Sequence, residues 1–207
     1  METLPLPENV LADLTELDSA TNERKQAERG GSLSIGPGEL LLGVPEAEAV
    51  NAAFCHPGPT GGRFHDRRRG AWYAGVELET SMAEVAFYKR RFLEDAHLTD
   101  QVTFEYQEFL ADFAGQYSHL DDHEQTSCLR RDPVPQCYQP SQAPAISLLY
   151  SGSNGIIFPS VRNPGGTCIA CFRPALVFHP RRGSRYGLTV QLALAWDAAN
   201  AQRLGDS

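Results

Sequence analysis

The sequence predicts an α+β fold in a chain of 207 residues. Short stretches rich in Trp, Tyr, Val and Phe are typical of strands, and between them lie stretches whose apolar residues follow helical spacing. Apolar residues make up 42% of the chain and charged residues 21%, the balance of a soluble globular protein. A chain of this length buries enough surface to need no disulfides, and its five cysteines, an odd number, fit reduced thiols.

The N-terminal quarter is expected to begin with an amphipathic helix over residues 8–29, which Gly30-Gly31 ends. Its apolar face would consist of Val10, Leu14 and Leu17, with Leu11 beside them. Residues 32–50 are interrupted by glycine and proline, and residues 51–54 are predicted to form a short strand. A loop rich in proline and glycine follows.

The middle of the chain is predicted to form a strand, a helix and a second strand. Residues 70–76 contain Trp, Tyr and Val and favour a strand. Thr80 or Ser81 can begin a helix that runs to about Leu93, with Glu84 placed to complete a capping box with Ser81. Residues 101–113 alternate between apolar and polar side chains and indicate the second strand.

The last third is predicted to contain one helix and three strands. Residues 115–140 are polar and irregular, and the expected elements follow as a helix over 141–150 and strands over 155–158, 168–172 and 188–196. Cys168 and Cys171 have the spacing of a metal or redox pair, but the chain has no second pair. Alternating strand geometry would place their sulfurs on opposite faces, so we interpret both as structural.

Charge and missing motifs exclude several function classes. The net charge is -8, and residues 1–60 hold ten acids against three bases, so the acidity belongs to the N-terminal quarter. We therefore expect no direct nucleic-acid binding, and we interpret the basic run Arg67-Arg68-Arg69 as a solvated face. No apolar run approaches 18 residues and no signal-peptide pattern opens the chain, which predicts a cytoplasmic protein without a membrane span. No Rossmann or P-loop motif occurs, and the acidic cluster at 121–124 is interpreted as a solvated loop, so no metal site is expected.

Three segments carry the candidate chemistry. The first is Gly61-Gly62-Arg63-Phe64-His65-Asp66, an arginine at a glycine turn, and the second runs from Trp72-Tyr73 to Glu84. The third is Gly155-Ile156-Ile157-Phe158-Pro159-Ser160-Val161-Arg162. In this order and with these spacings, the segments resemble the RES domain family, named for its Arg, Glu and Ser residues. Arg63, Tyr73, Glu84 and Ser160 match the family's motif positions.

The resemblance implies a fold and a function. Family members are similar to ADP-ribosyltransferases, so we expect a compact mixed-sheet core with flanking helices. They degrade NAD+ by hydrolysis or phosphorolysis of the bond between nicotinamide and ribose, and many are toxins paired with an Xre-type helix-turn-helix antitoxin. We accordingly expect residues 48–207 to form the catalytic domain and residues 1–47 to be an acidic helical extension packed on it. NAD+ would be a substrate, inorganic phosphate a co-substrate in phosphorolysis, and no resident cofactor is expected; a homo-oligomer stays open.

The residue chemistry agrees with this reading. The Arg63 guanidinium can grip phosphate oxygens through two parallel hydrogen bonds, unless it only pairs with Asp66. Glu84 can stabilise the positive ribosyl group that forms when nicotinamide leaves, unless it only caps a helix. Tyr73 offers a ring to the substrate, unless it is a core residue. Ser160 can position Glu84 or a ribose hydroxyl, unless it is only a turn residue. Weaker candidates for substrate contacts are Arg162, His56 and His65.

Two other functions stay open at this point. The same fold can move ADP-ribose onto a macromolecule. The domain can also be catalytically degenerate and serve as a binding module. Family members often carry a further arginine in an early strand, whereas the first arginine of this chain is Arg24, within a predicted helix. That departure is the main support for a binding module.

Overall fold

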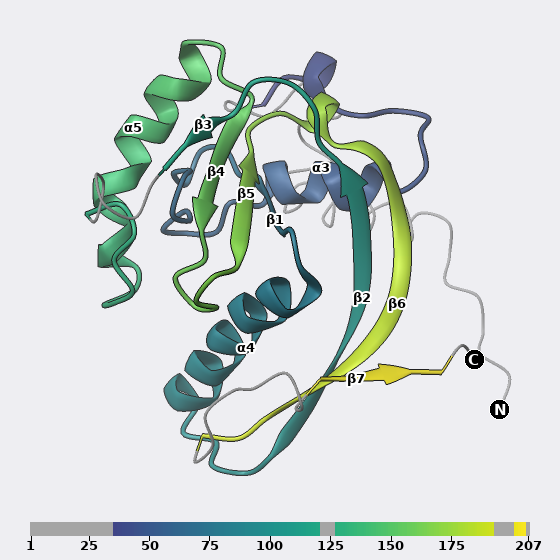
Figure 1. Cartoon of the computed structure of the whole chain (residues 1–207), viewed down its shortest axis with the longest axis vertical. Coiled ribbons are helices and arrows are strands. Elements are labelled where there is room, and N and C mark those ends of the chain that lie inside the picture. Colours follow the sequence, from purple (N-terminus) through teal and green to yellow (C-terminus); the bar gives the residue numbers. More distant parts are fainter. Residues whose placement is uncertain (1–34, 121–126, 193–200, 206–207) are drawn as a thin grey trace, which may run out of the picture.

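The structure is a computed structural model that describes residues 35–120, 127–192 and 201–205. Its described part contains a four-stranded and a three-stranded sheet, flanked by helices (Figure 1). The predicted α+β fold is therefore confirmed. The helix expected over residues 8–29 and the acidic cluster at 121–124 lie outside the described residues.

The four-stranded sheet is mixed and has the strand order β1-β5-β4-β3. These strands are β1 (Trp72–Gly75), β3 (Ser118–His119), β4 (Gly155–Pro159) and β5 (Thr167–Cys171). The pairs β1–β5 and β4–β5 are antiparallel, whereas β3 runs parallel to β4. The central pairing therefore joins a strand near residue 73 to strands near residues 157 and 169. This sheet brings the second and third motif segments together, because β1 belongs to the second and β4 to the third.

The second sheet is antiparallel and has the order β2-β6-β7. It consists of β2 (Val102–Asp112), β6 (Phe178–Val190) and β7 (Ala201–Leu204). The long, curved pair of β2 and β6 runs along one side of the molecule (Figure 1). The predicted strand over 101–113 is confirmed.

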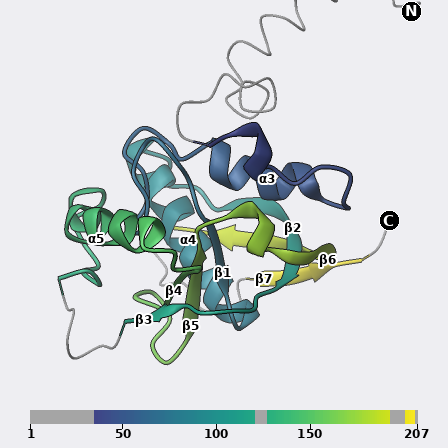
Figure 2. The same ribbon diagram turned by 90° about the horizontal axis from the view of Figure 1, so that it is seen from above.

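The three described helices are α3 (Ala47–Cys55), α4 (Leu78–Asp95) and α5 (Gln139–Tyr150). Seen from above, α5 and α3 lie on opposite sides of the four-stranded sheet (Figure 2). Short 3-10 turns are η1 (Pro37–Glu39), η2 (Gln136–Tyr138) and η3 (Pro174–Leu176). The predictions of helices near 80–93 and 141–150 are confirmed, as are the strands near 70–76, 155–158 and 168–172.

One predicted strand is wrong, and another is confirmed only in part. Residues 51–54 belong to α3 and do not form a strand. The alanines of this segment favour a helix, and its buried residues follow helical spacing at Val50, Asn51, Phe54 and Cys55. The strand predicted over 188–196 overlaps β6 (Phe178–Val190) at residues 188–190, β6 begins earlier than predicted, and residues 193–196 lie outside the described residues. Exposed arginines in β6 hide its apolar alternation from the sequence pattern.

The capping box predicted for α4 is also wrong. The helix begins at Leu78, with Glu77 as its N-cap residue. The Ser81 hydroxyl accepts a hydrogen bond from the backbone N–H of Gly75 at 3.0 Å. Glu84 lies beyond the first turn of the helix, and its carboxylate accepts a hydrogen bond from Ser160 instead.

Two cysteines of β5 face different cores, as predicted. Cys168 packs with Phe64 and Phe158 in one buried cluster, whereas Cys171 packs with Phe54 in another. All five cysteines of the chain are buried and free. The predicted placement of the two sulfurs on opposite faces is confirmed, and the interpretation of the thiols as reduced and structural stays a prediction.

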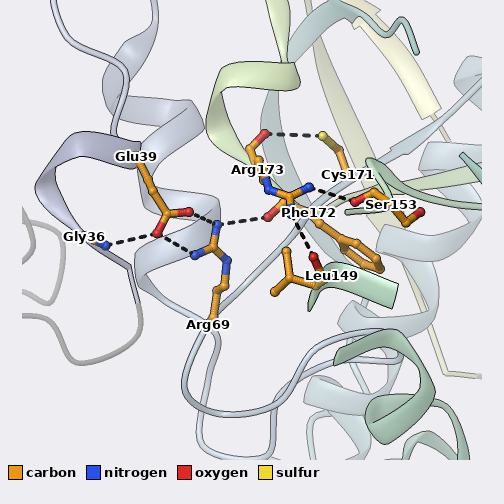
Figure 3. Close-up of polar contacts among 8 residues, drawn as sticks. All are labelled: Gly36, Glu39, Arg69, Leu149, Ser153, Cys171, Phe172 and Arg173. Atoms are coloured by element: carbon orange, nitrogen blue, oxygen red, sulfur yellow. Dashed lines mark hydrogen bonds and ion pairs between the residues drawn. The ribbon is translucent and has the colours of Figure 1, made fainter. Parts of the chain in front are cut away.

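Two arginines fasten the loop segments to the end of β5 (Figure 3). Arg69 donates to both carboxylate oxygens of Glu39, at 3.0 and 2.6 Å, and to the carbonyl oxygen of Phe172 at 3.1 Å. Arg173 donates to the carbonyl oxygens of Ser153 and Leu149, each at 2.8 Å. The side chain of Arg69 is only 13% exposed, so this residue departs from the solvated face predicted for the basic run.

Residues before α3 also belong to the packed structure. Ile35 and Leu40 are buried in the same cluster as Val50 and Phe54. The predicted domain boundary after residue 47 coincides with the first residue of α3. The boundary itself stays a prediction. None of the helices within the described ranges is long and apolar enough to cross a membrane.

We expect Tyr106→Phe to stabilise the protein by about 1 kcal/mol. The Tyr106 hydroxyl is buried, and no residue in the described ranges forms a hydrogen bond with it. A buried hydroxyl without a partner costs free energy that the phenylalanine ring does not incur. Urea denaturation measures the change in the free energy of unfolding. Tyr117→Phe, which removes a hydroxyl bonded to Cys171, is the matched comparison and should not stabilise the protein. Destabilisation by Tyr106→Phe would contradict this account.

Candidate active site

A tight glycine turn presents Arg63. Gly61 has φ +70, a conformation that favours glycine, and a Cβ atom there would lie 2.5 Å from the carbonyl oxygen of His65. The Gly62 N–H donates to that same oxygen at 3.0 Å and closes the turn. The two glycines before the arginine in the sequence are therefore explained by this tight turn. The turn holds the Arg63 backbone in one position.

The Arg63 side chain is buried without a carboxylate partner among the described residues. Its Nη1 donates to the carbonyl oxygen of Cys128 at 2.7 Å, and its guanidinium lies 4.9 Å from the centre of the Tyr138 ring. Asp66 pairs with Arg68 at 2.7 Å and not with Arg63. Within the described residues, one of the five N–H groups of Arg63 is used, which leaves its charge and remaining donors for an anion.

Glu84 and Ser160 meet directly, although they lie 76 residues apart. The Ser160 hydroxyl donates to Oε1 of Glu84 at 2.9 Å. The serine oxygen in turn accepts from the backbone N–H groups of Arg162 and Asn163, at 3.2 and 3.0 Å. These two donors leave the hydroxyl proton for the carboxylate. Ser160 therefore fixes the orientation of the Glu84 side chain.

The turn after β4 is also fastened to α4. The Asn163 side chain donates to the Thr80 hydroxyl at 2.9 Å, and the Ser160 N–H donates to the carbonyl oxygen of Gly166 at 2.8 Å. Thr80 and Glu84 are one helical turn apart on α4 and face the same turn. The helix and the turn thus form one rigid unit around the carboxylate.

Burial raises the pKa of Glu84 above its ordinary value. The hydrogen bond from Ser160 lowers the pKa in part, and so do the positive charges of Arg162, Arg63 and Arg131. The outcome is a carboxylate in a partly dry site with cationic groups nearby. Such an environment strengthens its attraction for a developing positive charge.

Tyr73 and His65 form a defined chain of hydrogen bonds. The Phe64 N–H donates to the Tyr73 hydroxyl at 2.8 Å, and that hydroxyl lies 3.1 Å from Nδ1 of His65. Nε2 of His65 lies 3.3 Å from the carbonyl oxygen of Pro57, which can only accept. Desolvation lowers the pKa of His65, so the ring is neutral with its proton on Nε2, and Tyr73 donates to Nδ1. The Tyr73 hydroxyl is therefore engaged, and its ring, 40% exposed as a residue, is the part open to a ligand.

Arg162 and His56 lie differently from the other predicted residues. The Arg162 guanidinium stacks 3.4 Å from the centre of the Phe87 ring and pairs with Asp132 at 3.5 Å. Its side chain is only 4% exposed. His56 follows α3 and is exposed, and none of its described contacts joins the cluster around Glu84. Their roles in substrate binding stay predictions.

In this geometry Ser160, from the third motif segment, contacts Glu84 on α4, and Arg63 at the glycine turn lies close to them. A family model described as the RES domain matches residues 41–197, about three quarters of the chain. The chain belongs to the RES domain family. The resemblance suspected from the motifs is thereby confirmed. No curated protein matches the chain.

Membership in the RES domain family supports a toxin-like function that involves NAD at the level of the family. The match spans every candidate residue from Arg63 to Arg162. In the described part of this RES domain, no group of three or more His, Cys, Asp or Glu side chains is placed to hold a metal ion.

Sequence reasoning missed two tyrosines of this RES domain. The hydroxyls of Tyr88 and Tyr138 form a hydrogen bond with each other. Tyr88 follows Glu84 by four residues on α4, a spacing that could have pointed to it. Tyr138 lies in η2, within a stretch that carries no periodic signal. Only the fold brings its ring to Arg63.

Proposed function

We propose that this RES domain protein cleaves NAD+ between nicotinamide and ribose. One observation carries the proposal: the Glu84 carboxylate is held by Ser160, and the cationic groups that act on it include Arg63. A carboxylate and an arginine that binds phosphate are the two groups that this substrate requires, because it combines a cationic leaving group with a pyrophosphate.

The reaction breaks the bond between C1 of the ribose and the nicotinamide nitrogen. The bonding electron pair leaves with nicotinamide, which becomes neutral, and positive charge develops on the ribose. The ionised Glu84 carboxylate stabilises that charge, as carboxylates do in glycosidases. Arg63 holds the pyrophosphate through its remaining donors, and the exposed ring of Tyr73 packs against the substrate. An acceptor oxygen then bonds to C1 and loses its proton.

The acceptor is water or inorganic phosphate, with no resident cofactor. Water yields ADP-ribose, whereas phosphate yields ADP-ribose 1''-phosphate. We further propose that the protein acts inside the cell as a toxin whose partner is an Xre-type helix-turn-helix antitoxin. Depletion of NAD+ is the physical basis of toxicity in this scheme, because NAD+ is consumed and not regenerated.

The decisive experiment incubates purified full-length protein with NAD+, with and without phosphate, and measures released nicotinamide. Nicotinamide together with ADP-ribose or its phosphate supports the proposal. Label from NAD+ on a protein or nucleic acid would instead indicate transfer to a macromolecule. Calorimetric binding of NAD+ without turnover would indicate a binding module. Absence of both binding and turnover would overturn the proposal.

We expect Ser160→Ala to move the acid limb of the pH–activity profile to higher pH. The Ser160 hydroxyl stabilises the ionised form of Glu84, so its loss raises the pKa of Glu84 further above the ordinary value. Activity needs the ionised form and therefore falls as pH decreases through that pKa. The profile of kcat/KM against pH measures the shift, and at neutral pH we expect a loss of about 10-fold or more. An unmoved acid limb would show that Ser160 does not set the charge of Glu84.

A further inference from the structure

We propose that the pair of Tyr88 and Tyr138 positions the Arg63 guanidinium relative to Glu84 and thereby sets the affinity for NAD+. This inference rests on the proposed function, because it assigns Arg63 to the pyrophosphate. The two tyrosines are positioning residues, and they act through Arg63. They link three separate parts of the chain: the glycine turn, α4 and η2.

The first step concerns how Arg63 is held. Its guanidinium has two described supports, the Cys128 carbonyl and the face of the Tyr138 ring. Both supports are uncharged. A carboxylate partner would compete with a phosphate for the guanidinium, whereas a carbonyl and a ring face orient it and leave its charge available. Tyr138 is only 4% exposed, so water does not reach this contact readily.

The second step concerns how Tyr138 is held. Its hydroxyl is bonded to that of Tyr88, which follows Glu84 by one turn of α4. Tyr88 is 47% exposed as a residue, but desolvation of its hydroxyl and the neighbouring Tyr138 raise the pKa of Tyr88. Tyr88 therefore keeps its hydroxyl proton at physiological pH, and the hydrogen bond between the two hydroxyls is retained. The Tyr138 ring that contacts Arg63 is therefore held in position by α4, the helix that carries the Glu84 carboxylate.

A further contact ties the backbones of the same parts. The Ser141 hydroxyl lies 2.6 Å from the carbonyl oxygen of Arg63 and 2.9 Å from that of Tyr138. Ser141 is 1% exposed. Arg63 is therefore fixed to the segment of Tyr138 at its main chain and at its side chain. With the main chain fixed, the Cys128 carbonyl and the tyrosine pair together determine where the guanidinium points, and the tyrosine pair is the part that a side-chain substitution can change.

The expected kinetic effect is specific. The pyrophosphate is remote from the bond that breaks, so Arg63 binds it equally in the ground state and the transition state. Loss of such uniform binding raises KM and leaves kcat nearly unchanged. A variant that merely unfolds part of the population lowers kcat and leaves KM unchanged. The split between KM and kcat therefore separates positioning from a structural role.

The experiment compares Tyr88→Phe, Tyr138→Phe, the double variant and Tyr138→Leu. Each Phe variant keeps the ring and removes one side of the same hydrogen bond, so we expect each to raise KM for NAD+ about 5-fold. The double variant should be no worse than either single variant, because one bond is lost in all three. Tyr138→Leu also removes the ring face and should raise KM about 10-fold or more.

Tyr106→Phe is the matched control, because it removes a buried phenol hydroxyl that lies outside the site, and its KM should equal that of the unaltered protein. The positioning role would be overturned if the effects of the two Phe changes on KM multiplied in the double variant. A fall in kcat at constant KM would overturn it as well. Binding of NAD+ by calorimetry in a Glu84→Gln background gives a second readout without turnover. If the unaltered protein neither binds nor cleaves NAD+, the proposed function itself fails. If it does both and the Tyr variants match it, only the present inference fails.

Discussion

Glu84→Gln is expected to lower kcat for NAD+ cleavage by about 100- to 1000-fold, the range seen when a group that stabilises transition-state charge is removed. The amide keeps the shape of the side chain and can still accept the hydrogen bond from Ser160. It cannot carry the negative charge that opposes the developing ribosyl cation. The loss should therefore appear in kcat and much less in KM. Release of nicotinamide under saturating NAD+ measures it.

The same variant should be more stable than the unaltered protein at neutral pH. Burial raises the pKa of Glu84 in the folded state, so the native state holds its proton more tightly than the unfolded state. That contribution to stability is present at low pH and is lost as pH rises through the folded pKa. Glutamine does not titrate, so the variant lacks this dependence of stability on pH. The difference in melting temperature between the variant and the unaltered protein should therefore vanish in acid. Glu79→Gln, on an exposed position of the same helix, is the control and should retain full activity. Unchanged kcat in Glu84→Gln would contradict the proposed mechanism.

Gly155→Ala is expected to destabilise the protein by about 3 kcal/mol or more, at the upper end of what overpacking a core costs. A Cβ atom at Gly155 would lie 2.1 Å from the carbonyl oxygen of Ala170 and 2.9 Å from the Tyr117 ring. The first contact is with backbone, so β4 and β5 would have to separate. For a chain of this size the melting temperature should fall by roughly 10 °C.

The matched control for this substitution is Gly38→Ala. Nothing lies within 4 Å of a Cβ atom at Gly38, so the free energy of unfolding should change by less than about 0.5 kcal/mol. Thermal and urea denaturation of both variants provide the comparison. A loss of less than 1 kcal/mol in Gly155→Ala would show that the two strands accommodate a methyl group between them.

Local sequence patterns were sufficient to predict a strand or helix where one spacing of apolar residues dominates the segment. Trp72 and Tyr73 marked β1, and the alternation from Val102 onward marked β2. The pattern failed in α3, where a short apolar run resembles a strand although its alanine-rich surroundings favour a helix. It failed again in β6, whose early residues are arginines that lie at the surface and pair with acids elsewhere in the chain.

The residues of the candidate site likewise fall into those that the sequence could identify and those that it could not. Arg63, Tyr73, Glu84 and Ser160 could be identified because each lies in a recognisable local motif of the family. The fold then joins Ser160 to Glu84 and Tyr73 to the Arg63 turn. Tyr138 could not be identified, because its partner Tyr88 is 50 residues away and no local motif surrounds it. Contacts of this kind depend on tertiary packing, to which a single sequence gives no direct access.

The pairing of β1 with β5 has a consequence for the synthesis of the protein. Trp72 is aligned with Cys171 and Gly75 with Cys168, so the strand that leads into α4 has its only described sheet neighbour near the end of the chain. During translation, Glu84 leaves the ribosome long before Ser160 and β5 exist. A nascent chain that stops before residue 171 lacks both the sheet and the hydroxyl that orient the carboxylate. Under the proposed function, cleavage of NAD+ would therefore have to wait until β5 has been synthesised and has paired with β1.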